Sequence, residues 1–166
     1  LILSQGDRFF IFNSINKLWI HKSNLIVNKA FVGVHIRRGD KITETNFISL
    51  DDYCLEIIRA CKLINTKCVY IFTDLKLDGE SLKDKLQGYD VELEFLDENG
   101  YFHQEYLNLS NDIKASKTLK LCDIVNKLAG SAYFIGSNDG NLSAFITILR
   151  NGKYVSDLRN EGLLIY

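Results

Sequence analysis

The 166-residue chain contains no methionine and no proline, and its acidic and basic residues nearly cancel to a net charge of −1. A translated protein needs an initiating methionine, so we expect this sequence to be a fragment or an excised domain of a longer protein. The lack of proline removes one common marker of a linker. A net charge this small gives no overall electrostatic attraction to nucleic acid or to an anionic membrane. Any anion-binding site must therefore be local.

Long apolar runs and metal-ligand spacings are missing as well. No run approaches the ~18 apolar residues that a membrane-spanning helix needs, so we expect no membrane contact from this segment. The four cysteines form no CxxC pair and have no pair of histidines nearby, so we expect no metal site. Cys54 and Cys61 fall in an apolar helical pattern and are expected to be buried free thiols.

What the sequence does contain is an alternation of strand and helix signals around one sizeable core, with 46% hydrophobic residues. We expect a helical N-terminal segment over residues 1–30 that packs on a domain formed by residues 31–166. Apolar patterns predict strands at about 31–38, 68–74, 91–97, 132–136 and 154–158, and helices at about 51–65, 79–87, 115–129 and from 142 onward. This alternation is typical of an α/β fold, a Rossmann-like parallel sheet flanked by helices.

Two of the predicted helices carry additional signals. Ser49 or Asp51 can cap the helix at 51–65, whose acidic first turn suits the helix dipole. The apolar residues of the helix at 115–129 predict an inner face, which comprises Leu119, Cys122, Ile124, Val125 and Leu128. The segment at 98–112, between the third strand and this helix, is rich in turn residues and is expected to be a loop.

The first strand runs into the sequence HIRRGDK, which places His35, Arg37 and Arg38 at a strand end. Guanidinium groups offer planar, bidentate donors that match phosphate. Ligands of open parallel sheets bind at the carboxyl edge, where this strand ends. A bare pair of arginines is more often a surface ion pair. The strand context favours anion binding here.

A second candidate anion-binding element is the turn at residues 136–143, in which Gly136 to Asn141 join the fourth strand to a helix start. Small residues allow the backbone to approach a ligand, and free amides at a helix N-terminus favour a phosphate oxygen. The turn is not a Walker loop, and no GxGxxG follows the first strand. Two such elements at different strand ends suggest one diphosphate held from both sides.

The HIRRGDK motif resembles the H-x-R-R-x-D-K signature of eukaryotic α-1,6-fucosyltransferases and rhizobial Nod-factor fucosyltransferases. A glutamate follows it three residues later, and an acidic helix start, DDY, comes after that. The resemblance continues through VYIFTD, VELEFLDEN and LKLCDIVNKLAGSAYFIGS, over about residues 31–150. This part corresponds to the C-terminal, nucleotide-binding half of a GT-B glycosyltransferase. The H-x-R-R-G-D core is also similar to α-1,2-fucosyltransferases, and Lys41 directly after Asp40 favours the α-1,6 group.

The resemblance implies inverting, metal-independent transfer of fucose from GDP-fucose to a glycan hydroxyl. No cofactor is expected. The expected partners are GDP-fucose, a glycan acceptor and a missing N-terminal domain of the same enzyme, with no nucleic acid. The compartment would be the Golgi lumen for a eukaryotic parent and the cytoplasm for a bacterial one.

The resemblance also implies roles for individual residues at the start of the domain. Arg37 would bind the β-phosphate, with Arg38 supporting it or fixing the loop. His35 would lie near the guanine and ribose end of the nucleotide. Glu44, one residue further along than in the family, would be the general base that takes the acceptor proton, with Lys41 beside it.

Two further parts of the chain match donor-binding positions. Asp123 corresponds to a residue near the guanine and ribose, although its helix position is equally consistent with a carboxylate facing solvent. The turn contributes Ser137, Asn138, Asp139 and Gly140, of which Asp139 and Gly140 replace a Ser-Gln pair of the family. A carboxylate repels phosphate unless it points away, so backbone amides of 138–141 would carry that contact.

Two other functions remain open on the sequence. One is a catalytically inactive domain with a sugar-nucleotide fold that binds a glycan or a protein. The other is an unrelated α/β enzyme that handles a phosphorylated metabolite. A match of fold does not by itself decide among them.

Overall fold

The computed structural model describes residues 30–38, 48–97, 108–137, 141–150, 155–158 and 162–164. Its elements, in chain order, are β1 (Val32–Ile36), α2 (Leu50–Leu63), β2 (Cys68–Thr73), α3 (Lys76–Lys85), β3 (Glu92–Phe95), α5 (Asn111–Ala129), β4 (Tyr133–Gly136), α6 (Asn141–Leu149), β5 (Val155–Asp157) and β6 (Gly162–Leu164). The helix expected within residues 1–30 lies outside these ranges.

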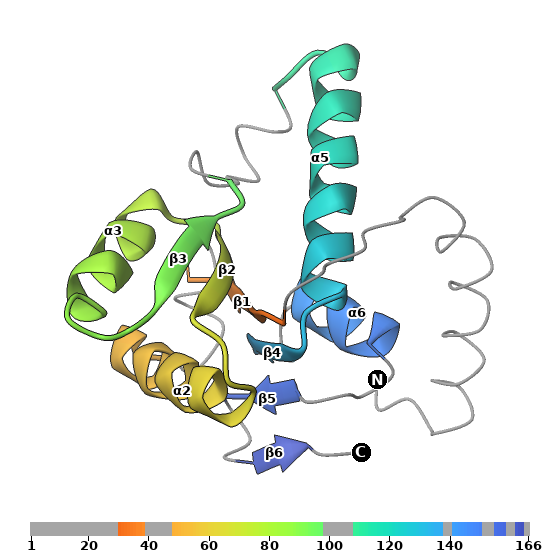
Figure 1. Ribbon diagram of the computed structural model, residues 1–166. Helices are drawn as coiled ribbons and strands as arrows, with labels where there is room; N and C mark the ends of the chain where they lie inside the picture. Colours follow the sequence, from red (N-terminus) through yellow and green to blue (C-terminus); the bar gives the residue numbers. More distant parts are fainter. Residues whose placement is uncertain are drawn as a thin grey trace.

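The described strands form one six-stranded sheet in the order β3-β2-β1-β4-β5-β6. The strands from β3 to β5 are parallel, and β6 pairs with β5 in the antiparallel direction. Figure 1 shows α2 and α3 on one face of the sheet and α5 and α6 on the other. The predicted fold class, a Rossmann-like parallel sheet flanked by helices, is confirmed.

The centre of the sheet is β1, between β2 and β4, and every residue of this strand is buried. A strand that is covered on both faces has a nearly continuous apolar sequence, and the sequence VGVHI therefore predicts a buried strand clearly. Val34 and Ile36 belong to the hydrophobic cluster beneath α2 and α3. Successive side chains of a strand point to opposite faces, so His35 points toward α5 and α6.

Helix α2 begins where its capping signal predicts. The Ser49 hydroxyl accepts a hydrogen bond from the Asp52 amide at 3.1 Å, and the Asp52 carboxylate accepts one from the Ser49 amide at 3.3 Å. This reciprocal pair is a capping box. It provides hydrogen-bond acceptors for two amides at the helix start that have no partner within the helix. Of the two predicted caps, Ser49 is therefore the one used. Cys54 and Cys61 on this helix are buried free thiols, as expected.

Helix α5 is longer than predicted and turns one predicted core residue outward. It begins at Asn111, so the loop prediction for 98–112 is wrong for its last two residues, and 98–107 lie outside the described residues. Ser110 is the N-cap residue of α5. Serine, asparagine and aspartate are common in helix N-caps as well as in turns, so the polar sequence here was equally consistent with a loop. Leu119 is 68% exposed. It lies five and nine residues before the buried Ile124 and Leu128, which places it on the opposite side of the helix.

The remaining differences are small. Helix α3 begins at Lys76 rather than near residue 79, and β6 was not predicted. A strand of three residues, such as β6, is too short for its periodicity to be recognised in a sequence. Among the described residues no helix is long and apolar enough to cross a membrane.

On the face of the sheet that α5 and α6 cover, the packing at Gly33 is too close to leave room for a side chain, and buried hydrogen bonds join the two helices. A Cβ at Gly33 in β1 would lie 2.9 Å from the Ser131 hydroxyl oxygen. Arg150, just after α6, is buried and donates to the Ala129 carbonyl at 3.1 Å and to the Ser131 hydroxyl at 2.7 Å. Burial lowers the pKa of Arg150 to about 10, and the guanidinium ties the end of α6 to the turn between α5 and β4.

Candidate functional site

The two predicted anion-binding elements meet at the carboxyl edge of the sheet. β1 and β4 are parallel neighbours, so the end of β1 lies beside the end of β4. The two elements are joined directly, because His35 Nδ1 and Ser143 Oγ are 2.6 Å apart although 108 residues separate them in the chain. This contact brings a residue of each element together at one edge of the sheet.

His35 is held in a buried, neutral state. Its side chain is 3% exposed and stacks on the Phe72 ring, with ring centroids 5.6 Å apart. Burial, together with the smaller effect of the positive charge of Arg37, lowers the pKa of His35 from 6.5 to about 3. At neutral pH the imidazole therefore carries no charge. It can accept or donate a hydrogen bond, but any cationic contribution to the site must come from other groups.

Ser143 falls within the predicted anion-binding element at residues 136–143, but it was not among the residues predicted to bind the donor. It lies in the first turn of α6, is 1% exposed, and its hydroxyl is within 3.4 Å of the Ser137 amide as well as bonding His35. The hydroxyl can accept from the Ser137 amide and donate to Nδ1 of neutral His35. A Cβ at Gly136 would lie 2.8 Å from the Ser143 oxygen, so the glycine before the turn keeps room for this hydroxyl. A small residue early in a helix is too common a pattern to be read as a signal.

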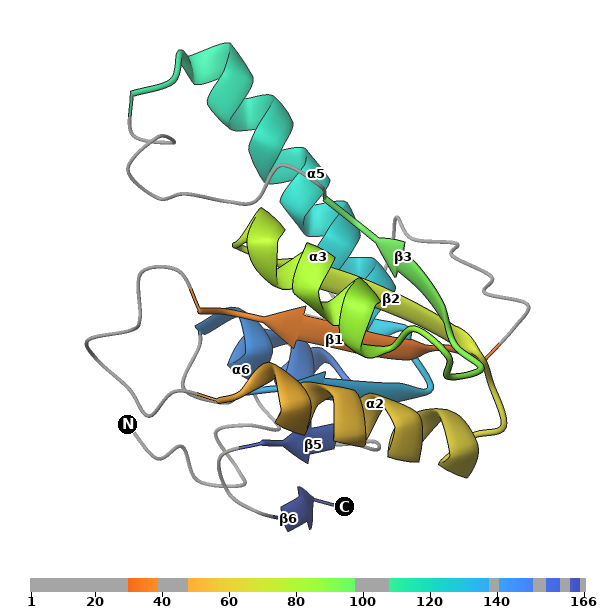
Figure 2. The same cartoon turned by 90° about the vertical axis from the view of Figure 1, so that its left-hand side faces the viewer.

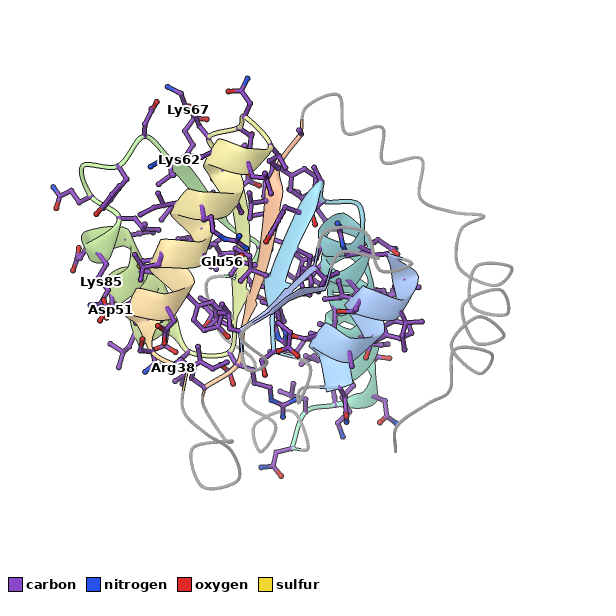
Figure 3. All side chains as sticks on the ribbon, turned by 90° about the horizontal axis from the view of Figure 1, so that it is seen from below. Arg38, Asp51, Glu56, Lys62, Lys67 and Lys85 are labelled. Carbon is purple, nitrogen blue, oxygen red and sulfur yellow. The ribbon has the colours of Figure 1, made fainter. Side chains whose placement is uncertain are left out.

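The adjacent arginines have different surroundings. Arg38 Nη1 donates to Asp78 Oδ1 at 3.1 Å, and both side chains are largely buried, at 13% and 11% exposed. Arg37 lies close enough to His35 to lower the pKa of that residue. Of the two roles expected for Arg38, fixing the strand end fits this ion pair, and Arg37 is the arginine on the His35 side. Figure 3 shows Arg38 at the same end of the fold as Asp51, with Lys62 and Lys67 at the opposite end.

Three acidic residues lie at this edge of the sheet, two of them in contact with Arg38. The Asp74 carboxylate, just after β2, accepts a hydrogen bond from the Arg38 amide at 3.0 Å. Burial raises the pKa of the Asp78 carboxyl, and the nearby Arg38 guanidinium opposes that shift. Asp157, at the end of β5, is buried and pairs in register with Gly136. None of these three carboxylates was among the predicted site residues.

The other predicted site residues divide into two groups. Ser137 directly follows β4 and is half-buried, whereas Asp123 is exposed on α5, which fits its solvent-facing interpretation. The residues expected to supply the base, its neighbour and the rest of the turn lie outside the described residues; they are Glu44, Lys41, Asn138, Asp139 and Gly140. Over the ranges that the structure describes, no group of three or more His, Cys, Asp or Glu residues is placed to hold a metal ion.

The fold of this chain is similar to that of known crystal structures. POFUT1 in complex with GDP superposes with a TM-score of 0.54 at 12% identity, over 90% of this chain and 45% of that chain. POFUT1 in complex with GDP-fucose superposes with a TM-score of 0.51 at 12% identity, over 90% and 45%. The fold is fucosyltransferase-like. The chain spans less than half the length of the POFUT1 chains it matches.

Sequence comparisons add no closer relative, since no protein-family model and no curated protein matches the chain. At 12% identity the likeness to POFUT1 shows the shared fold. The α-1,6 linkage suggested by the HIRRGDK motif stays a prediction.

Proposed function

We propose that this chain is the donor-binding part of a fucosyltransferase that uses GDP-fucose. The contact between His35 and Ser143 carries the proposal, because it joins the arginine-bearing end of β1 to the first turn of α6. A diphosphate at this edge would have a guanidinium on one side and helix amides on the other. The similar fold of POFUT1, determined with GDP and with GDP-fucose, supports this choice of ligand.

The chemistry assigned to the site is inverting transfer without a metal. Glu44 is assigned as the general base that takes the proton of the acceptor hydroxyl as it attacks the anomeric carbon, with Lys41 beside it. The leaving GDP gains negative charge as the glycosidic bond breaks. Arg37 stabilises that charge at the β-phosphate. Such electrostatic stabilisation of the transition state is usually the largest single contribution to catalysis.

The neutral state of His35 supports this division of roles. An uncharged, buried imidazole cannot balance the charge of a diphosphate, so it is suited to orienting the nucleotide or the helix that carries Ser143. The cationic role then falls to Arg37, with Arg38 fixing the strand end. Ser137 and the backbone of residues 138–141 contribute neutral donors at the other side of the diphosphate.

The acceptor is a glycan hydroxyl, with the α-1,6 linkage favoured by HIRRGDK. The chain matches less than half of POFUT1, so the acceptor contacts are assigned mainly to a further domain of the parent protein. The parent would act in the Golgi lumen if eukaryotic and in the cytoplasm if bacterial.

The decisive experiment is calorimetric titration of the domain with GDP, GDP-fucose and ADP, comparing the unsubstituted chain with Arg37→Ala. We expect selective binding of the guanosine nucleotides. Arg37→Ala should weaken it by ~1.5–3 kcal/mol, or about tenfold and more, because a charge-assisted bond to phosphate is lost.

Lys117→Ala, on α5, is a control that removes one positive charge from another part of the surface. Equal binding of ADP and GDP would favour another enzyme of phosphorylated metabolites. GDP-fucose binding without turnover by the full-length parent would favour an inactive binding domain. A folded domain and a folded parent that both fail to bind GDP would refute the proposal.

A further inference from the structure

The side chains of Arg37 and Arg38 leave the end of β1 toward opposite faces of the sheet. β1 ends at Ile36, so the directions of the two side chains follow from their surroundings: Arg38 pairs with Asp78 of α3, and Arg37 lies close enough to His35 to lower the pKa of that residue. His35 contacts Ser143 of α6, and Ile36 packs in the cluster under α2 and α3. Fixing the face on which Arg38 lies therefore also fixes the face to which Arg37 is directed.

Arg38 is held at two points that lie on different elements. Its guanidinium pairs with Asp78 in the first turn of α3, at 3.1 Å, and its amide donates to the Asp74 carboxylate after β2, at 3.0 Å. The Asp74 amide in turn donates to the Ile36 carbonyl at 3.4 Å. These bonds continue the attachment of β1 to β2 beyond the last paired residues of the strands.

The position of Asp78 is itself closely defined by packing. The next residue, Gly79, approaches the Phe95 ring of β3 so closely that a Cβ would lie 2.9 Å from a ring carbon. The first turn of α3 is thus seated against the sheet, and it presents a carboxylate to Arg38 from a fixed place. Asp78 is 8% exposed, and its Oδ2 is a buried atom without a hydrogen-bond partner among the described residues.

A buried ion pair with one oxygen unsatisfied is an inefficient way to gain stability. Taking both charges out of water costs about as much as their attraction returns, and an unsatisfied oxygen adds to that cost. What such a pair supplies is a defined geometry for the groups attached to it.

We propose that Asp78 is a positioning residue, which holds Arg38 so that Arg37 is directed to the face where His35 and Ser143 lie. The inference rests on the proposed function, since Arg37 is taken to bind the diphosphate. Asp78 is not itself in contact with the donor. It acts through Arg38, and Asp74 supports the same strand end through the backbone.

The test is a cycle of GDP-binding measurements with Asp78→Asn, Arg37→Ala and the combined variant. We expect Asp78→Asn to weaken GDP binding about tenfold, as coupled residues of one network do. In the Arg37→Ala background the same substitution should have almost no further effect. Glu80→Gln, also on α3 and in a surface pair with Lys76, is the matched control and should bind GDP as the unsubstituted chain does. Equal losses with and without Arg37 would overturn the proposal.

Hydrogen exchange separates this inference from the proposed function. The Arg38 amide should exchange several-fold faster in Asp78→Asn than in the unsubstituted chain, and Glu80→Gln should leave it unchanged. If the unsubstituted chain binds no GDP, the proposed function fails, and this exchange measurement still decides whether Asp78 fixes the strand end. An unchanged Arg38 amide would refute the inference. If Asp78→Asn does not fold, Arg38→Gln removes the same ion pair from the other side, and the same binding and exchange criteria apply to it.

Discussion

The neutral, buried state of His35 predicts a specific dependence of stability on pH. The pKa of this residue is 6.5 in an exposed chain and about 3 in the folded protein, because burial disfavours the charged ring. Since the folded pKa is the lower one, the contribution of His35 is fully present above pH 6.5. It is lost progressively as the pH falls from 6.5 toward 3, where the unfolded chain binds a proton that the folded chain does not.

The magnitude follows from proton linkage. Between about pH 7.5 and about pH 5.5 the unfolded histidine becomes mostly protonated, and the folded one stays neutral. This difference lowers the free energy of unfolding by ~1.3 kcal/mol, with a slope that approaches ~1.4 kcal/mol per pH unit at the acidic end. Most carboxylates remain ionised in this interval, so His35 is separated from the groups that dominate acid unfolding.

The measurement is urea unfolding across that interval for the unsubstituted chain and for His35→Gln. Glutamine cannot titrate, and its amide can still bond the Ser143 hydroxyl. The difference in the free energy of unfolding between the two proteins should shrink by ~1.3 kcal/mol on acidification. The other histidines contribute equally to both proteins and cancel in the difference. A constant difference would show that His35 titrates normally in the fold, and the argument for a neutral imidazole at the site would be wrong.

Three further substitutions test the packing that supports the site, each by urea unfolding at neutral pH. Ser143→Ala should lower the free energy of unfolding by ~1–3 kcal/mol, because it leaves a buried ring nitrogen of His35 without this partner. The control Thr118→Ala removes an exposed hydroxyl from α5 and should change it by no more than ~0.5 kcal/mol. Equal losses in the two variants would contradict the contact. Gly33→Ala should lower the free energy of unfolding by ~1–3 kcal/mol through overpacking against Ser131. An unchanged urea midpoint would show that α5 can shift at no cost. Arg150→Leu should cost ~2–4 kcal/mol because several buried carbonyls lose a charged donor, which a fully stable variant would disprove.

Much of the fold could be predicted because the deciding signals are local. The apolar run of β1 and the capping box at Ser49 each lie within a few residues, and the structure places both elements where they were expected. The alternation of strands and helices was enough to predict a parallel sheet with helices on both faces, as Figure 2 shows from a second direction. Helix periodicity failed for Leu119, because its apolar side chain lies on the side of α5 that faces away from the sheet.

The candidate site could be predicted only in outline. Sequence indicated two strand ends that suit an anion, and the structure shows them joined through His35 and Ser143. Ser143 itself was not among the residues predicted to bind the donor, and neither was Asp78, since serine and aspartate are common near helix starts. Glu44 and Lys41, which carry the proposed chemistry, stay predictions from the motif alone.

The sequence by itself determined the succession of elements, the buried central strand and the position of the arginines at its end. These depend on hydrophobic periodicity and on capping, which act over a few residues. Only the tertiary structure decided that Arg38 pairs with Asp78 and that His35 is neutral beside Ser143. Both follow from the order of strands, which brings distant segments to one edge of the sheet and removes them from water, and a pKa or an ion pair depends on that burial.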